Sequence, residues 1–148
     1  AYAHRLLRKE QFLGVCASDS PLAGRHLELE ELLAQRLIIR EPGSGTREIL
    51  EKMLQQFSYG VGSFSHVSQI SSFTTIKSLV AGGEGITFLY RPAAEHELAE
   101  GVLTEMDIEG FPLLREFNFV MPEGVPPEER HLNFHDFCQK FLDCGQAD

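Results

Sequence analysis

The residues best suited to chemistry lie in a Gly-rich turn at residues 42–47, PGSGTR. Ser44 and Thr46 provide hydroxyl groups, and Arg47 provides a positive charge. Gly45 leaves its backbone N–H group uncovered by a side chain. A helix that begins at such a turn directs free N–H groups and the positive end of its dipole at one point, which suits a carboxylate, phosphate or sulfate. Ser and Thr are also ordinary helix caps, so a turn that binds nothing has the same residue types.

The elements on either side of this turn must position it. Residues 37–39 form a short apolar run of the kind buried in a parallel sheet, and apolar residues then recur at helical spacing over residues 49–57. The alternation continues with a predicted strand at residues 64–70, a helix at 73–80 and a strand at 86–90. This order predicts an α/β layer with two right-handed parallel crossovers.

Two loops of this layer are expected to converge. Parallel strands end at the same edge of a sheet, and ligands bind beyond their carboxyl ends. The loops at residues 42–47 and 71–75 therefore face the same side of the predicted sheet. The second loop offers the hydroxyls of Ser71 and Ser72, next to Phe73 at the start of the following helix. The convergence of the two loops is more informative than either loop alone.

The rest of the chain is predicted to add further strands and helices. The expected elements are a strand at residues 11–17, an acidic helix at 28–34, a polar helix at 92–101, strands at 102–108 and 113–121, and a closing helix at 128–143. The closing helix carries His131 and His135 four residues apart, a spacing that can share a metal, but no third ligand has suitable spacing. We therefore expect no metal site and no cofactor.

Composition excludes several classes of function. The chain has 148 residues, 43% of them hydrophobic, and a net charge of −9, which argues against binding nucleic acid or an anionic membrane by itself. No apolar run is long enough to span a bilayer. Cys16, Cys138 and Cys144 form no CxxC pair, so no disulfide framework or zinc site is indicated and a reducing cytoplasm is expected. Cys16 is predicted to be a small buried apolar residue.

The sequence lacks the common motifs of enzymes. It contains no G-x-S-x-G and no H-E-x-x-H. The turn at residues 42–47 lacks the lysine of a phosphate-binding P-loop, and residues 43–48 lack the third glycine of a dinucleotide fingerprint. The carboxylates are scattered over helix faces, without a pair in apolar surroundings. We therefore expect no catalytic residues and no enzymatic activity.

Three segments together carry a resemblance to a known family. Residues 20–23 (SPLA), the acidic Leu-rich helix after them, and residues 37–47 (LIIREPGSGTR) resemble the effector-binding domain of LysR-type transcriptional regulators. Residues 76–86 (IKSLVAGGEGI) are similar to the helix–glycine–strand segment of that family. The order and spacing of these segments agree with the family over residues 10–145, which is nearly the whole chain.

The resemblance implies a fold, a ligand and partners. The implied fold is a Rossmann-like lobe of a two-lobed, type 2 periplasmic-binding-protein-like domain, with a small-molecule effector in the cleft between the lobes. The effector is expected to be anionic. The residues that match the cleft-lining positions of the family are Ser44, Gly45, Thr46 and Arg47 from one loop, and Ser71, Ser72 and Phe73 from the other. The family is cytoplasmic, forms homo-oligomers, and reaches DNA through a winged helix-turn-helix domain.

The resemblance also implies how the chain divides. Residues 1–10 are expected to be a hinge strand from the first lobe, residues 11–108 the second lobe, and residues 109–148 a segment that returns to the first lobe. The DNA-binding domain and most of the first lobe are expected to lie outside this chain, and no membrane partner is expected. An alternative is a solute-binding protein domain without a regulatory role. An enzyme on the same layer is a third possibility, which would need a catalytic group from outside the chain.

Overall fold

The computed structural model of the chain describes the backbone of residues 2–122 and the side chains of residues 9–116. It divides the chain into two compact units, Phe12–Leu113 on one side and Ala1–Gln11 with Leu114–Asp148 on the other. The predicted closing helix at residues 128–143, with His131 and His135, lies outside the described residues.

The order of elements along the chain is that of an α/β protein. The elements are β1 (Tyr2–Ala17), β2 (His26–Leu27), α1 (Leu29–Leu32), β3 (Arg36–Ile39), α2 (Gly45–Gln56), η1 (Val61–Ser63), β4 (His66–Gln69), α3 (Phe73–Ala81), β5 (Thr87–Tyr90), η2 (Arg91–Ala94), α4 (Glu95–Glu100), β6 (Leu103–Glu105), β7 (Asp107–Ile108) and β8 (Leu113–Pro122). In the unit that contains Ala1–Gln11 and Leu114–Asp148, β8 pairs with β1.

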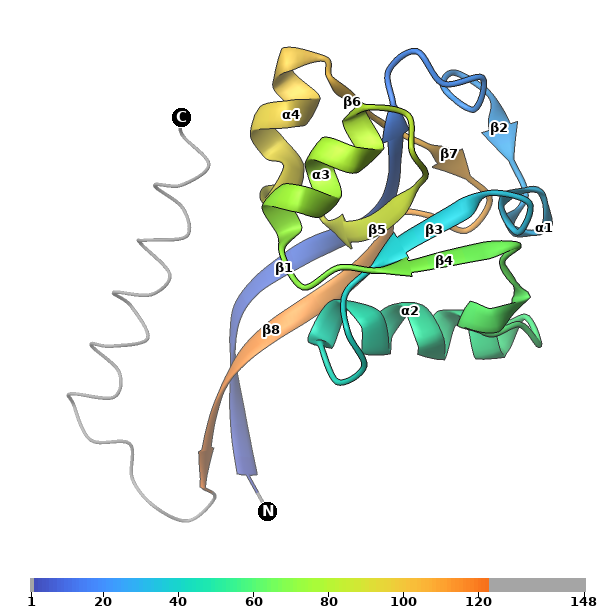
Figure 1. Ribbon diagram of the computed structural model, residues 1–148. Coiled ribbons are helices and arrows are strands. Elements are labelled where there is room, and N and C mark those ends of the chain that lie inside the picture. Colours follow the sequence, from blue (N-terminus) through green and yellow to red (C-terminus); the bar gives the residue numbers. More distant parts are fainter. Residues whose placement is uncertain (1, 123–148) are drawn as a thin grey trace. The chain divides into compact units, whose positions relative to one another are not determined.

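The unit Phe12–Leu113 is built on a sheet with a parallel half and an antiparallel half (Figure 1). Strands β3 and β4 pair in parallel, with Leu37 opposite Val67. On its other side β3 meets the chain just before β5 in a parallel bridge between Leu37 and Ile86. Residues 12–15 of β1 pair antiparallel with β5, and residues 15–17 pair antiparallel with β6. The predicted alternation of three parallel strands with two helices is confirmed.

Two backbone hydrogen bonds join β3 to the residue just before β5. The backbone N–H of Ile38 donates to the carbonyl of Ile86, and the N–H of Ile86 donates to the carbonyl of Arg36, both at 2.9 Å. Gly85 makes this approach feasible, because a Cβ atom there would lie 2.5 Å from the carbonyl oxygen of Arg36. Only glycine fits between the two backbones without a shift.

The helices cover both faces of the sheet. Because β4 and β5 lie on opposite sides of β3, right-handed crossovers place α2 and α3 on opposite faces. Figure 1 shows α2 on one face, with α3 and α4 on the other. The core divides accordingly: Leu37 and Ile39 pack in the cluster with Leu50 of α2, whereas Ile38 packs in the cluster with Ile76 of α3. This alternation of side chains makes β3 buried on both faces, as its continuous apolar run predicts.

The strand predicted at residues 102–108 is wrong in one respect, because the segment is two strands with different partners. β6 pairs with β1, whereas β7 pairs in parallel with β2, as a separate ribbon. Leu103 faces one core cluster, and Met106 and Ile108 face the other, so the period-two pattern runs through the break. Such alternation reports which face a side chain occupies and not which strand it pairs with.

Smaller differences concern two helices and a cysteine. The acidic helix is shorter than predicted: α1 covers Leu29–Leu32, and Glu31 and Glu28 form a capping box at its start. The polar helix begins as the 3-10 turn η2 with a proline near its first position, and becomes α-helical only at Glu95. Cys16 is buried, as predicted, and burial raises the pKa of its thiol.

Candidate functional site

A small pocket lies where β3 and β5 meet the first turns of α2 and α3. Its volume is about 10 Å³, room for about one water molecule, which is far below the ~300–1,000 Å³ typical of small-molecule pockets. Its walls are formed by side chains from both strands and both helices, namely Ile39, Arg40, Thr46, Arg47, Leu50, Phe73, Ile76, Thr87 and Phe88. The pocket therefore lies beyond the carboxyl end of a parallel strand, where α/β sheets bind ligands.

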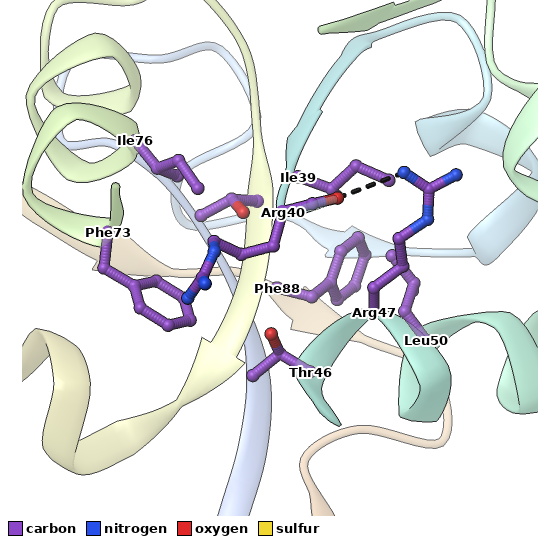
Figure 2. Close-up of a pocket in the computed structure, with 9 residues that line it drawn as sticks. Ile39, Arg40, Thr46, Arg47, Leu50, Phe73, Ile76 and Phe88 are labelled. Carbon is purple, nitrogen blue, oxygen red and sulfur yellow. Dashed lines mark hydrogen bonds between the residues drawn. The ribbon is translucent and has the colours of Figure 1, made fainter. Parts of the chain in front are cut away.

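The first turn of α2 contributes Thr46 and Arg47 to this pocket, whereas Ser44 and Gly45 precede them and do not line it. Ser44 is the N-cap residue, and its Oγ accepts a hydrogen bond of 3.3 Å from the backbone N–H of Arg47. Its Oγ also lies 3.5 Å from Oγ1 of Thr46. Gly45 has nothing within 4 Å of the place where a Cβ atom would stand. In Figure 2 the hydroxyl of Thr46 points into the space between Phe73 and Phe88.

Arg47 lines the pocket, but its guanidinium is held by the protein. Nε donates to Oε1 of Glu51 at 2.8 Å, and Nη1 donates to the backbone carbonyl of Arg40 at 3.1 Å. Nη1 also lies 3.4 Å from Oε1 of Gln69, at the end of β4. The side chain is only 14% exposed. These partners make Arg47 a tie between α2, β3 and β4.

Arg40 supplies a second positive charge at the pocket. Figure 2 shows the side chains of Arg40 and Arg47 pointing in opposite directions, with Arg40 directed toward Phe73. The guanidinium carbon of Arg40 stands 4.7 Å from the centre of the Phe73 ring, a cation–π contact. Nε and Nη2 of Arg40 donate to the two carboxylate oxygens of Glu41, at 3.1 and 2.9 Å. These hydrogen bonds raise the pKa of Arg40 and lower the pKa of Glu41.

The second predicted loop contributes less than the first. Phe73 lines the pocket, whereas Ser71 and Ser72 are exposed and do not line it. Ser72 is the N-cap of α3, and its Oγ accepts from the backbone N–H of Thr75 at 3.4 Å. In the structure Ser72 therefore caps α3, and Ser71 is the residue before the cap.

Of the nine residues that line the pocket, sequence reasoning named three as site residues and missed six, among them Arg40, Thr87 and Phe88. Arg40 follows the last residue of β3, and the rule that ligands lie beyond strand ends could have identified it. Thr87 and Phe88 come from β5. Thr87 is buried and its Oγ1 donates to the carbonyl of Ile38 at 2.6 Å, which ties β5 to β3. No local signal marks these two residues, because their place in the pocket depends on the pairing of β5 with β3.

Two other hollows in the described part of the chain lack positive charge. One open groove of about 460 Å³ is lined by Glu28, Leu29, Glu30, Phe57, Tyr59, Glu109 and Gly110. Another of about 240 Å³ is lined by Ala17, Asp19, Ser20, Pro21, Gln35, Gly83, Gly85 and Ile86. Neither contains a lysine or an arginine, so neither suits an anion. The pocket with Arg40 and Arg47 does.

Within residues 2–122 no group of three or more His, Cys, Asp or Glu side chains is placed to hold a metal ion. Among the helices in this part of the chain, none has the length and apolar character needed to cross a membrane.

Comparison with known proteins identifies the chain. Residues 1–143 match the family profile described as "LysR substrate binding domain". The HTH-type transcriptional regulator CbbR of Rhodospirillum rubrum is 39% identical over 111 residues, 74% of this chain and 36% of that protein. The RuBisCO operon transcriptional regulator of Acidithiobacillus ferrooxidans is 40% identical over 124 residues, 83% of this chain and 39% of that protein. The chain thus spans less than half the length of these curated relatives.

Solved structures agree with the fold. The regulatory domain of CcmR from Synechocystis PCC6803, described as a complex with 2-PG, has a TM-score of 0.77 and 25% identity, covering 95% of this chain and 66% of that chain. The regulatory domain of MetR, a LysR family regulator from N. meningitidis, has a TM-score of 0.75 and 22% identity, covering 99% of this chain and 65% of that chain.

The fold is that of the type 2 periplasmic-binding-like class. Its layers and its parallel crossovers are those of that class. The chain belongs to the LysR substrate-binding domain family. The predicted family and fold are therefore confirmed, and the regulatory reading is supported over a solute receptor, because the relatives are named as transcriptional regulators.

Proposed function

We propose that the chain senses a small anionic effector for a LysR-type transcription regulator, and that the pocket at residues 40–47 and 73 binds the anion. The observation that carries this proposal is the meeting of Arg40 and the first turn of α2 in one pocket. A guanidinium and the free N–H groups of a helix start both favour a carboxylate or a phosphate. The pocket is small, so we propose that it forms one wall of a larger effector cleft.

The relatives support an anion of a particular class. The CcmR regulatory domain is described as a complex with 2-PG, 2-phosphoglycolate, which carries both a phosphate and a carboxylate. The regulators that are 39% and 40% identical are named for CbbR and for the RuBisCO operon. We therefore propose a small phosphorylated carboxylate as the effector class, with 2-phosphoglycolate as the first compound to test.

Not all of the predicted site residues have the same place in this proposal. Thr46 and the backbone at Gly45 are proposed to bind the anion directly, and Phe73 to position Arg40. Ser44 is proposed to shape the turn by capping α2. Ser71 and Ser72 lie outside the pocket of the unliganded protein, and we propose that they contact the effector only when it extends beyond the pocket.

The remaining parts of the proposal follow from the family. We propose that residues 11–108 form the second lobe and that residues 1–10 and 109–148 belong to the first. The division of the chain at Gln11–Phe12 and Leu113–Leu114 supports this assignment. The regulator is proposed to form a homo-oligomer in the cytoplasm, to reach DNA through a helix-turn-helix domain and to have no catalytic activity. The relatives are named as transcriptional regulators, one of them of the HTH type, which supports the helix-turn-helix domain and fits a protein that is not an enzyme.

Thermal unfolding of the full-length gene product against a panel of anions tests the proposal. The panel contains 2-phosphoglycolate, inorganic phosphate, glycolate and sulfate. A ligand at a hundred times its dissociation constant stabilises a protein by about 2.7 kcal/mol, which raises the midpoint of unfolding clearly. We expect 2-phosphoglycolate to give the largest rise.

Two threonine variants locate the site. Thr46→Val removes a hydroxyl from the pocket and keeps the shape of the side chain, so we expect about two- to tenfold weaker binding of 2-phosphoglycolate. Thr75→Val is the control, because Thr75 also lies in the first turn of a helix but is exposed to solvent and does not line the pocket. Equal affinities of the two variants would place the anion elsewhere, and a panel without any binding anion would refute the proposed effector class.

A further inference from the structure

We propose that Glu41 is an internal anion that occupies Arg40 in the unliganded protein, so that an effector binds Arg40 by displacing Glu41. This inference rests on the proposed function, in which the pocket binds an anion. It assigns to Glu41 the control of affinity and of selectivity between effectors of different charge.

Glu41 holds Arg40 in the way that a ligand would. Its two carboxylate oxygens accept from Nε and Nη2 of Arg40, at 3.1 and 2.9 Å. Two parallel N–H···O bonds of this kind are the arrangement in which arginine binds a free carboxylate or phosphate. An incoming anion that uses the same edge of the guanidinium must therefore compete with Glu41.

The surroundings of Arg40 keep it in place when Glu41 leaves. The guanidinium lies over the ring of Phe73, with 4.7 Å between its carbon and the ring centre. The backbone of Arg40 is fixed through its carbonyl, which accepts from Nη1 of Arg47 at 3.1 Å. Arg40 is thus oriented by contacts that do not involve Glu41, and an effector does not have to order it.

The surroundings of Glu41 allow it to leave. Its side chain is 40% exposed, compared with 24% for Arg40, so the carboxylate can turn into water without being desolvated. Its backbone carbonyl accepts from the N–H of Ser44 at 3.2 Å, and Pro42 follows it. The turn therefore stays formed while the side chain moves.

Competition with Glu41 favours effectors of higher charge. A monocarboxylate offers Arg40 two carboxylate oxygens and one negative charge, as Glu41 does. Glu41 competes better, because it is tethered next to Arg40 and is therefore present at a high effective concentration. A phosphate monoester carries about −1.5 to −2 charges at neutral pH and a third oxygen. Glu41 therefore suppresses binding of monocarboxylates and leaves phosphorylated compounds as competent effectors.

Isothermal titration of the full-length gene product with 2-phosphoglycolate and with glycolate tests this role. Glu41→Gln keeps the size of the side chain and removes its charge. Apparent affinity falls with the fraction of protein that is competent to bind, so releasing Arg40 is expected to tighten binding of 2-phosphoglycolate by about three- to tenfold. Glycolate, undetectable or weak in the wild type, is expected to bind measurably to this variant.

A control variant and a double-mutant cycle separate displacement from a change in net charge. Glu48→Gln removes one negative charge from the first turn of α2. Glu48 is exposed and does not contact Arg40. Its effect on affinity is expected to be below about twofold. In an Arg40→Gln background, Glu41→Gln is expected to have no effect beyond that of Glu48→Gln, because the two residues act through one contact.

The outcomes distinguish the inference from the proposed function. Tighter binding by Glu41→Gln that disappears in the Arg40→Gln background supports the inference. Wild-type and Glu41→Gln proteins that bind 2-phosphoglycolate equally would overturn the inference and leave the anion site standing. An equal gain from Glu48→Gln would also overturn it, because general charge would then explain the effect. If neither anion binds the wild type or Glu41→Gln, both the proposed function and the inference fail.

Discussion

Nη1 of Arg47 donates a hydrogen bond of 3.1 Å to the backbone carbonyl oxygen of Arg40, and so joins the first turn of α2 to the end of β3. Its Nε pairs with Glu51 one helical turn later at 2.8 Å. The Gly-rich turn between the two arginines is thereby closed by a side chain from its far end. An arginine that the sequence offers as an anion ligand is, in the structure, a brace for the turn.

Replacement of Arg47 by lysine tests this bracing role. Lysine keeps the charge but cannot form several hydrogen bonds in fixed directions, so Arg47→Lys is expected to lower the free energy of unfolding by about 1–2 kcal/mol. Urea denaturation measures the change. Glu51→Gln, which removes only the charge of the half-exposed partner, is expected to lower it by no more than ~0.5 kcal/mol. If Arg47→Lys has no larger effect than Glu51→Gln, the bond to the Arg40 carbonyl does not stabilise the turn.

A methyl group at Gly85 is expected to separate β3 from β5. The Cβ atom of Gly85→Ala would stand 2.5 Å from the carbonyl oxygen of Arg36, and backbone has to move to make room. Overpacking of this kind lowers the free energy of unfolding by about 1–3 kcal/mol. Gly60→Ala is the control, because nothing lies within 4 Å of its Cβ position and its φ of −136° suits any residue. Similar midpoints in urea for the two variants would contradict the close approach.

The buried hydroxyl of Thr87 is expected to stabilise the same pair of strands. Thr87→Val keeps the shape of the side chain but removes the bond to the carbonyl of Ile38, and the free energy of unfolding is expected to fall by about 1–2 kcal/mol. Thr104→Val removes a hydroxyl that bonds Ser18 at an exposed position, and a change within ~0.5 kcal/mol is expected there. Both values come from urea denaturation, and equal values would mean that the Thr87 bond is not formed in solution.

His26 is expected to make thermal stability depend on pH. Hydrogen bonds from its ring to Asp107, at 3.1 Å, and to Glu109, at 2.9 Å, raise its pKa in the folded state. The folded protein therefore binds the proton more tightly than the unfolded chain does. This contribution is fully present below the unfolded pKa of about 6.5 and is lost as the pH rises through the higher folded pKa.

The melting temperature of His26→Asn measures this contribution. The variant is expected to melt about 1–3 °C below the wild type near pH ~5.5 and to match it near pH ~9. A constant difference between His26→Asn and the wild type across this range would argue against the two ion pairs.

The fold was predictable where a segment's own pattern determines it. The apolar run of β3, the helical spacing of α2 and α3 and the Gly-rich turn between them are local features, and the structure has all three. The place of β1 was not predictable from pattern. Gln11–Ala17 reads as a strand, but nothing in these residues indicates that β5 and β6 become its antiparallel neighbours. The prediction of one strand at residues 102–108, where the structure has β6 and β7, was wrong for the same reason, since pairing depends on distant residues.

The candidate site was predictable to the same extent. Thr46 and Phe73 stand at helix starts, and helix starts can be read from capping residues and glycine. Thr87 enters the pocket because β5 lies beside β3, a tertiary fact. Arg40 could not be predicted from helix starts, because its role depends on where β3 ends and on the ring of Phe73, which lies 33 positions later in the chain (73 − 40 = 33). Residues that act through sequence neighbours were found, and residues that act through the sheet were missed.

The central place of β1 also has a consequence for biosynthesis. Residues 12–17 of this strand leave the ribosome before every other strand of the sheet, yet their partners are Thr87–Tyr90 and Leu103–Glu105. During that interval both edges of the segment lack a neighbour, and Phe12 and Leu13, wholly buried in the finished protein, are exposed to water. Pairings so distant in sequence form slowly and leave nascent chains prone to aggregate. A nascent chain that stalls before β6 is therefore expected to depend on chaperones that bind extended apolar segments.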